Sequence, residues 1–471
     1  MSRRWQKKLS KQLISSLQEK RYDKNAAKNS THNDTRLNYG ILPYLLSLGA
    51  LLTTPLKQEE RKEVFSEKSG PFKTVFQWSQ IDFLFESEVH RNSVLASGNF
   101  IQENNLPLGI EVYKNRIFIS LPVWKSGVPA TLTVLPTDSL EKSPLLVPYP
   151  NWSWHNTGSC NRLTSVFRMQ ADVCDRLWVL DSGQINVATE SQQVCPPSIL
   201  IFDLSTDKLI LKYDLPQELV KQDSLYSNIL IDVQKDDCSS AHAYLADVWR
   251  FGLVVFNLKT LKAWRVTDHL FFPDPLAAAY KVNGLEFEWT DGIFGLALSP
   301  FNKYSIDRTL YFNPMSSFRE FYTKTSIIRN ETGWSSYKDA FKVYGQSRGK
   351  NGQASSCAMD RNGVLFFGLV TQNALGCWDS RKTYKRKNLA IIAQNDYTMV
   401  FPNDVKVDNE PKQSVWMITN RLPFFIYNRF EPKDVNFRVL SAYAEEMVKG
   451  TICDPKVRHS GSYTNDYNEC F

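Results

Sequence analysis

The chain has 471 residues, of which 42% are apolar and 13% aromatic, enough for a large folded core and a composition that suits pleated sheets. The formal net charge is +7, but much of the basic excess lies within residues 1–25. A second basic run, residues 381–387 (RKTYKRK), is expected to form a solvated loop. The charge therefore does not predict nucleic-acid binding by the folded part of the chain.

Residues 1–60 are predicted to precede the fold. They comprise a polar, basic arm and then an apolar, signal-like segment at residues 41–52 (ILPYLLSLGALL), which is too short to span a bilayer comfortably. Because a secretion signal normally follows only a short basic region, the segment is either a signal-anchor with a long cytoplasmic arm or a cleavable signal downstream of the given start. We expect the second arrangement, a secreted extracellular protein without a stable membrane span.

From residue 61 to residue 453 one short pattern recurs six times: an aromatic residue lies between apolar neighbours, and a small or polar residue follows. The aromatic positions are, in chain order, Phe118, Trp178, Tyr244, Tyr311, Phe366 and Trp416. Each lies in the middle of a strand-like run, so we attribute these rings to packing between sheets and not to a ligand cage.

Further strand-like runs flank most copies of this pattern, for example SVFRMQADVCD before the second copy and PPSILIFDLST after it. Three or four strands per repeat, repeated six times, predict an all-β fold, a six-bladed β-propeller over residues 61–453. Residues 72–83 (FKTVFQWSQIDF) offer a strand that could join the last blade and close the ring. Residues 454–471 are predicted to form a polar C-terminal tail.

The eight cysteines include no C-x-x-C pair, and no histidine lies at zinc-finger spacing. This argues against structural zinc and favours disulfides in an oxidising compartment. Cys174 and Cys238 would each follow the first strand of consecutive blades, so we expect them to pair. Two further pairs are considered, although spacing does not determine connectivity: Cys160 with Cys195, and Cys377 with Cys453.

Sequons for N-linked glycosylation begin at Asn29, Asn33, Asn151 and Asn330. The first two lie in the arm that precedes the fold. We therefore expect glycosylation at Asn151 and Asn330, which would fit an extracellular protein.

Several longer motifs occur in a fixed order along the chain. They are GSCNRLTSVFRMQADVCDRLWVLDSG (158–183), FFPDP (271–275), DGIFGLALSP (291–300), RTLYFNPMSS (308–317), NALGCW (373–378) and FPNDVKVD (401–408). Together they resemble the insect yellow and major royal jelly protein family, from residue 72 to residue 453. The resemblance implies a secreted six-bladed propeller. Members are associated with cuticle pigmentation, eggshell, nutrition and, in the saliva of blood-feeding insects, capture of biogenic amines; some are proposed to convert dopachrome in melanin synthesis.

The resemblance also implies a ligand pocket in the last blade. In amine-binding salivary members this pocket uses positions that match Asn403, Asn420 and Leu422 here. Those binders have threonine at the first position and an aromatic residue at the third. An asparagine oxygen can accept a hydrogen bond from an ammonium group, but Leu422 offers no ring to stack on an indole or catechol. A structural turn role for Asn420 is equally open.

Catalytic chemistry has few candidates in the sequence. There is no G-x-S-x-G motif, and the six histidines lie in tails, loops or strand edges, so a Ser-His-Asp hydrolase is disfavoured. Asp291, Asn403 and Asp404 begin probable inner strands, and their oxygens could converge on Ca²⁺. We favour a turn-capping role for them and expect neither a metal nor a cofactor.

Three functions are compatible with these residues and with the resemblance. The preferred one is binding of a small catechol- or indole-amine-like molecule in cuticle, eggshell or pigment biology. The second is an enzyme of the dopachrome-converting, isomerase type, for which Asp291 and Asp404 are the candidate acid or base. The third is a structural protein whose partner is the extracellular matrix.

Overall fold

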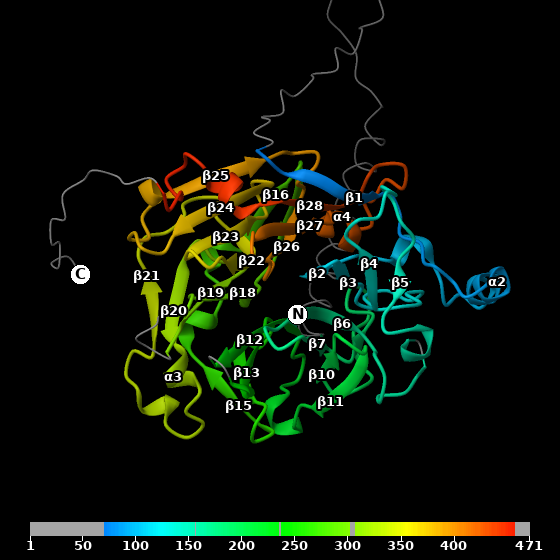
Figure 1. Ribbon diagram of the computed structural model, residues 1–471, viewed down its shortest axis with the longest axis horizontal. Coiled ribbons are helices and arrows are strands. Elements are labelled where there is room, and N and C mark those ends of the chain that lie inside the picture. Colours follow the sequence, from blue (N-terminus) through cyan, green and yellow to red (C-terminus); the bar gives the residue numbers. More distant parts are fainter. Residues whose placement is uncertain (1–69, 156, 235–236, 302–306, 457–471) are drawn as a thin grey trace, which may run out of the picture. The chain divides into compact units, whose positions relative to one another are not determined.

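The computed structural model describes residues 70–155, 157–234, 237–301 and 307–456, all within the unit formed by residues 64–471. The predicted basic arm, the signal-like segment and residues 457–471 of the predicted tail lie outside the described residues. Six four-stranded sheets form the blades of a propeller around a central channel (Figure 1). The predicted fold class is therefore confirmed.

The first three blades follow one another along the chain, each from its inner to its outer strand. The first is β2 (Gly109–Tyr113), β3 (Arg116–Ser120), β4 (Leu132–Pro136) and β5 (Val147–Pro148). The second is β6 (Val166–Ala171), β7 (Arg176–Asp181), β10 (Ser198–Asp203) and β11 (Lys208–Asp214). The third is β12 (Tyr226–Gln234), β13 (Asp237–Asp247), β14 (Gly252–Asn257) and β15 (Lys262–Thr267).

The last three blades complete the ring. The fourth is β18 (Ile293–Leu298), β19 (Thr309–Pro314), β20 (Glu320–Lys324) and β21 (Phe341–Tyr344). The fifth is β22 (Ala354–Met359), β23 (Val364–Leu369), β24 (Ala374–Asp379) and β25 (Leu389–Gln394). The sixth is β26 (Pro402–Val407), β27 (Ser414–Thr419), β28 (Phe437–Tyr443) and β1 (Lys73–Trp78).

The N-terminal strand closes the ring as predicted. β1 pairs antiparallel with β28, in a register that places Trp78 opposite Phe437, and it forms the outer edge of the sixth blade. Each inner strand packs beside that of the next blade, and β26 packs beside β2. The six inner strands therefore surround the axis of the ring (Figure 1).

Smaller elements lie between and outside the blades. Two hairpins are β8 (Gln184–Ile185) with β9 (Gln192–Gln193), and β16 (Ala279–Val282) with β17 (Leu285–Glu288). The α-helices are α2 (Glu88–Ala96), α3 (Thr325–Ile328), α4 (Leu422–Ile426) and α5 (Ala444–Val448). Helix α2 stands out from the edge of the ring beside the first blade (Figure 1). No helix among the described residues is long and apolar enough to cross a membrane.

The recurring aromatic residue lies on the second strand of every blade and is buried in the core, as predicted. In three blades its polar atom is used as well. The Trp178 indole donates to Asp172 (2.7 Å), the Tyr244 hydroxyl to Asp232 (2.9 Å) and the Trp416 indole to Asp408 (2.9 Å). A carboxylate near the end of the inner strand or just beyond it thus satisfies the one polar group of a buried ring.

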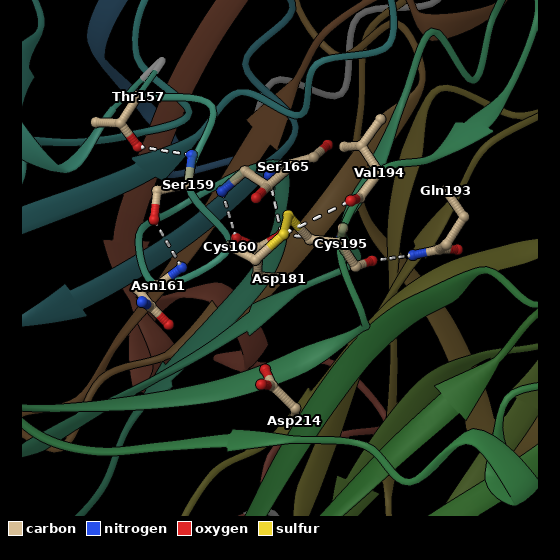
Figure 2. The surroundings of a disulfide bond; sticks show 12 residues. Thr157, Ser159, Cys160, Asn161, Ser165, Asp181, Gln193, Val194, Cys195 and Asp214 are labelled. Carbon is tan, nitrogen blue, oxygen red and sulfur yellow. Dashed lines mark hydrogen bonds between the residues drawn. A yellow bond between two sulfur atoms is a disulfide. The ribbon is translucent and has the colours of Figure 1, made fainter.

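Three disulfides join segments that are distant in sequence, and they are the three pairs considered above. Cys174–Cys238 links the second and third blades. Cys377–Cys453 links the fifth blade to the segment after α5. Figure 2 shows the third bridge, Cys160–Cys195, which joins the loop before β6 to the loop before β10.

A candidate site in the central channel

A cavity of about 520 Å³ occupies the channel. Every inner strand contributes to its wall, through Glu111, Gln170, Ile231, Leu298, Met359 and Lys406 among others. The cavity extends to the turns that follow the inner strands, where Asp172, Phe301 and Asp360 line it. Its wall therefore mixes apolar side chains with several polar and charged ones, which could fix the orientation of a bound small molecule.

Two oppositely charged side chains from neighbouring blades face each other in this wall. Glu111 lies on β2 and Lys406 on β26, with 3.5 Å between Oε2 of Glu111 and Nζ of Lys406. Their side chains are only 6% and 13% exposed, respectively. Lys406 also donates to the carbonyl of Met169 (3.0 Å), and Oε1 of Glu111 accepts the amide of Val112 (2.9 Å). The backbone therefore holds both side chains in place.

The pKa of Glu111 is raised from its ordinary 4.5 to about 7. Burial is the main cause, because a charged carboxylate loses its hydration inside the wall. The positive charge of Lys406 and the amide of Val112 act in the opposite direction, and the charge of Asp404 adds to the increase. A carboxyl group with this pKa can both accept and release a proton near neutral pH.

A buried ionic cluster crosses the channel wall near Glu111. The Arg168 guanidinium on β6 pairs with Oδ1 of Asp404 on β26, and it donates to the carbonyl (2.8 Å) and to Oδ1 (2.9 Å) of Asn403. Oδ2 of Asp404 accepts the amide of Ile110 on β2 (3.0 Å). The guanidinium carbon lies 5.1 Å from the centre of the Phe294 ring on β18. Side chains and backbone from four blades are thus tied together at this level of the channel.

The structure does not place the predicted pocket residues in the cavity wall. Asn420 is fully buried; its side chain donates to the carbonyl of Pro107 (3.0 Å) and accepts the amide of Leu422 (3.2 Å). Leu422 begins α4 and packs in the core. Asn403 is fully buried and bound to Arg168. The three side chains make these contacts within the fold, Nδ2 of Asn403 has no hydrogen-bond partner among the described residues, and the assignment of all three as ligand-binding residues stays a prediction.

The two predicted acid–base candidates differ from each other. Asp404 is the counter-ion of Arg168 and is fully buried. Asp291 precedes β18, whereas the cavity wall on that strand begins at Leu296, so it lies toward the opposite end of the inner strand. Burial raises the pKa of Asp291 to about 6, and a hydrogen bond from Trp249 opposes the increase. Neither residue lines the cavity.

Comparison with known proteins assigns the chain to a family. The family model described as "Major royal jelly protein" matches residues 164–453. The chain belongs to the yellow and major royal jelly protein family. The match covers blades two to five and the sixth blade except β1; it includes Arg168, Asp404 and Lys406 but begins after Glu111.

Curated relatives extend this similarity through the first blade. The protein from Drosophila melanogaster named "Dopaminechrome tautomerase" is 43% identical over 413 residues, 86% of this chain and 88% of that protein. "Protein yellow" of the same species is 39% identical over 384 residues, 80% of this chain and 70% of that protein. Among solved structures, virginiamycin B lyase from Staphylococcus aureus aligns with a TM-score of 0.39 and 11% identity, over 72% of this chain and 96% of that one.

The most informative side chains of this yellow-family channel were missed at the sequence level. Glu111 is the one charged residue of β2, Arg168 the one charged residue of β6, and Lys406 follows Asp404 on β26. A charged residue inside such a strand is the signal that could have drawn attention to them, because it must find a partner when buried. The sequence could not supply the pairing of these side chains. Glu111 lies 295 positions from Lys406, and Arg168 lies 236 positions from Asp404, and each pair joins two different blades.

The two predicted glycosylation sites lie at the surface of the protein. Asn151 and Asn330 are exposed, as glycosylation would require, and their modification stays a prediction. Among the described residues, no three His, Cys, Asp or Glu side chains gather closely enough to hold a metal ion.

Proposed function

We propose that this yellow-family protein is secreted and converts an aminochrome, the cyclised quinone of a catecholamine, into its dihydroxyindole tautomer during pigment formation in cuticle or eggshell. The observation that carries the proposal is the channel cavity, whose wall of mixed apolar and polar side chains contains an acid–base pair. A relative 43% identical over most of both chains carries the name dopaminechrome tautomerase, which supports the same chemistry here.

The chemistry suits what the cavity contains. A tautomerisation moves protons from carbon to oxygen and needs no net oxidant or reductant, so positioned side chains suffice to catalyse it. The substrate is a flat bicyclic molecule, for which a cavity of about 520 Å³ is large enough.

The test is turnover of freshly prepared dopaminechrome by the full-length protein secreted from cultured eukaryotic cells, which can form its disulfides. We expect faster loss of the quinone absorbance than with heat-treated protein, and a product of unchanged mass that mass spectrometry identifies as dihydroxyindole. Equal rates with native and heat-treated protein would contradict the proposal.

The same preparation separates the alternatives. Binding without turnover would favour the amine-binding hypothesis, and thermal unfolding would detect it, because a ligand at about 100 times its Kd adds about 2.7 kcal/mol of stability. Neither turnover nor a shift with dopamine, dopa, serotonin or dopachrome would favour the structural, matrix-associated hypothesis.

A further inference from the structure

We infer that Glu111 and Lys406 are the proton-transfer pair of the channel: the Glu111 carboxylate takes a proton from a substrate carbon, and the Lys406 ammonium gives one to a quinone oxygen. This inference rests on the proposed function. Both side chains line the cavity, and each comes from the inner strand of a different blade.

Glu111 differs from the other carboxylates of the cavity wall because it faces a cation, Lys406, that also lines the cavity. Asp172 is consumed by its own turn: its oxygens accept two backbone amides, the Arg176 guanidinium and the Trp178 indole. Asp360 accepts the backbone amides of its own turn. Glu111 spends Oε1 on one amide and turns Oε2 toward Lys406. It is the cavity carboxylate that a substrate can approach beside a cation.

The charges around Glu111 suit it to this role. Lys406 faces it from β26, and Asp404 lies on the same strand two residues earlier, already paired with Arg168. Arg308, which also lines the cavity, is directed to Asp232 at 3.4 Å. The resulting pKa of about 7 gives a base that is partly ionised at neutral pH and whose conjugate acid readily gives up its proton.

The protons that Glu111 and Lys406 gain and lose balance over one transfer. The Glu111 carboxylate removes a proton from a saturated carbon of the five-membered ring; the C–H electrons form a ring double bond, and a quinone C=O pair moves onto oxygen. The Lys406 ammonium protonates that oxygen. The proton then passes from Glu111 to Lys406 and restores both groups. Two such transfers, one from each saturated ring carbon, convert the aminochrome into the dihydroxyindole without change in composition.

The experiment measures kcat/KM for dopaminechrome from about pH 5 to about pH 9, with the non-enzymatic rate subtracted. For the wild-type full chain we expect the rate to fall below about pH 7, as Glu111 takes up its proton. Glu111→Gln should lower kcat about 10²- to 10⁴-fold. Lys406→Met removes the charge that lowers the pKa of Glu111, so its acid limb should move to higher pH. Lys406→Arg keeps a positive charge, so its acid limb should lie closer to that of the wild type.

A matched control and the wild-type profile keep the outcomes distinct. Glu288→Gln changes an exposed carboxylate on β17 and should leave the rate unchanged. An active wild type with an equally active Glu111→Gln variant overturns the inference and spares the proposed function, whereas an inactive wild type removes the proposed function itself. If Glu111→Gln is not secreted, a wild-type rate that stays flat through about pH 7 overturns the inference by itself.

Discussion

At the scale of single residues, the channel holds charge in two different ways. Arg168 and Asp404 neutralise each other in full burial, and a backbone amide and a backbone carbonyl add further hydrogen bonds. Removing one partner of such a pair leaves an uncompensated buried charge and is strongly destabilising. Glu111 is less well compensated, because Lys406 lies 3.5 Å away and the pKa of the carboxyl stays raised. The fold therefore tolerates an acid in the wall at a cost in stability that depends on pH.

The raised pKa of Glu111 predicts the sign of a stability change. The folded state favours the protonated acid, so this group contributes stability below about pH 4.5, and that contribution is lost as the pH rises through about 7. Glutamine does not ionise, so Glu111→Gln should gain stability relative to wild type over this window, by about 3 kcal/mol for a shift of this size. Denaturant unfolding of both proteins at acidic and alkaline pH measures it, and a difference that does not change with pH would contradict it.

At the scale of elements, every blade has an aromatic residue at the same position of its second strand, but the contacts of that residue differ between blades. Tyr244 and Tyr311 hold this position in consecutive blades and are both buried. The Tyr244 hydroxyl donates to Asp232 at the end of the inner strand. The Tyr311 hydroxyl makes no hydrogen bond to any described residue, and its ring packs against Tyr344 and Trp378. The repeat thus keeps its ring packing while its polar contact varies.

This difference provides a matched pair of substitutions. Tyr244→Phe removes a buried hydrogen bond to a carboxylate and should lower the free energy of unfolding by about 1–3 kcal/mol. Tyr311→Phe removes a hydroxyl without such a partner and should cost clearly less. Thermal or denaturant unfolding of the two variants checks the order, and equal losses would show that the contact with Asp232 adds nothing.

At the scale of the whole molecule, the ring depends on contacts between segments far apart in sequence. β1 closes the sixth blade beside β28, and the Cys174–Cys238 bridge spans a sequence separation of 64 between two neighbouring blades. Such a crosslink reduces the freedom of the unfolded chain in proportion to the logarithm of the enclosed loop. Closure and crosslinking together make the propeller one cooperative unit.

Replacing both Cys174 and Cys238 with serine should lower the free energy of unfolding by up to about 4 kcal/mol, the chain-entropy value for a loop of this length. The other two disulfides remain in this variant, so its secretion and far-ultraviolet spectrum serve as the control for folding. An unchanged unfolding midpoint would show that the inter-blade packing alone sets the stability.

The sequence by itself determined the fold class, the six repeats and the closing strand, because alternating apolar residues and a recurring aromatic are local signals that survive without coordinates. The positions of Cys174 and Cys238 in consecutive repeats indicated one disulfide, whereas the two other pairs were considered without the sequence determining them. The motifs of the last blade directed attention to Asn403, Asn420 and Leu422. Only the tertiary structure showed that Asn403 contacts Arg168, that Asn420 contacts Leu422, and that Glu111 faces Lys406 in the cavity wall. The physical reason is that burial and pairing across blades depend on the closed ring, which brings the first and last inner strands together.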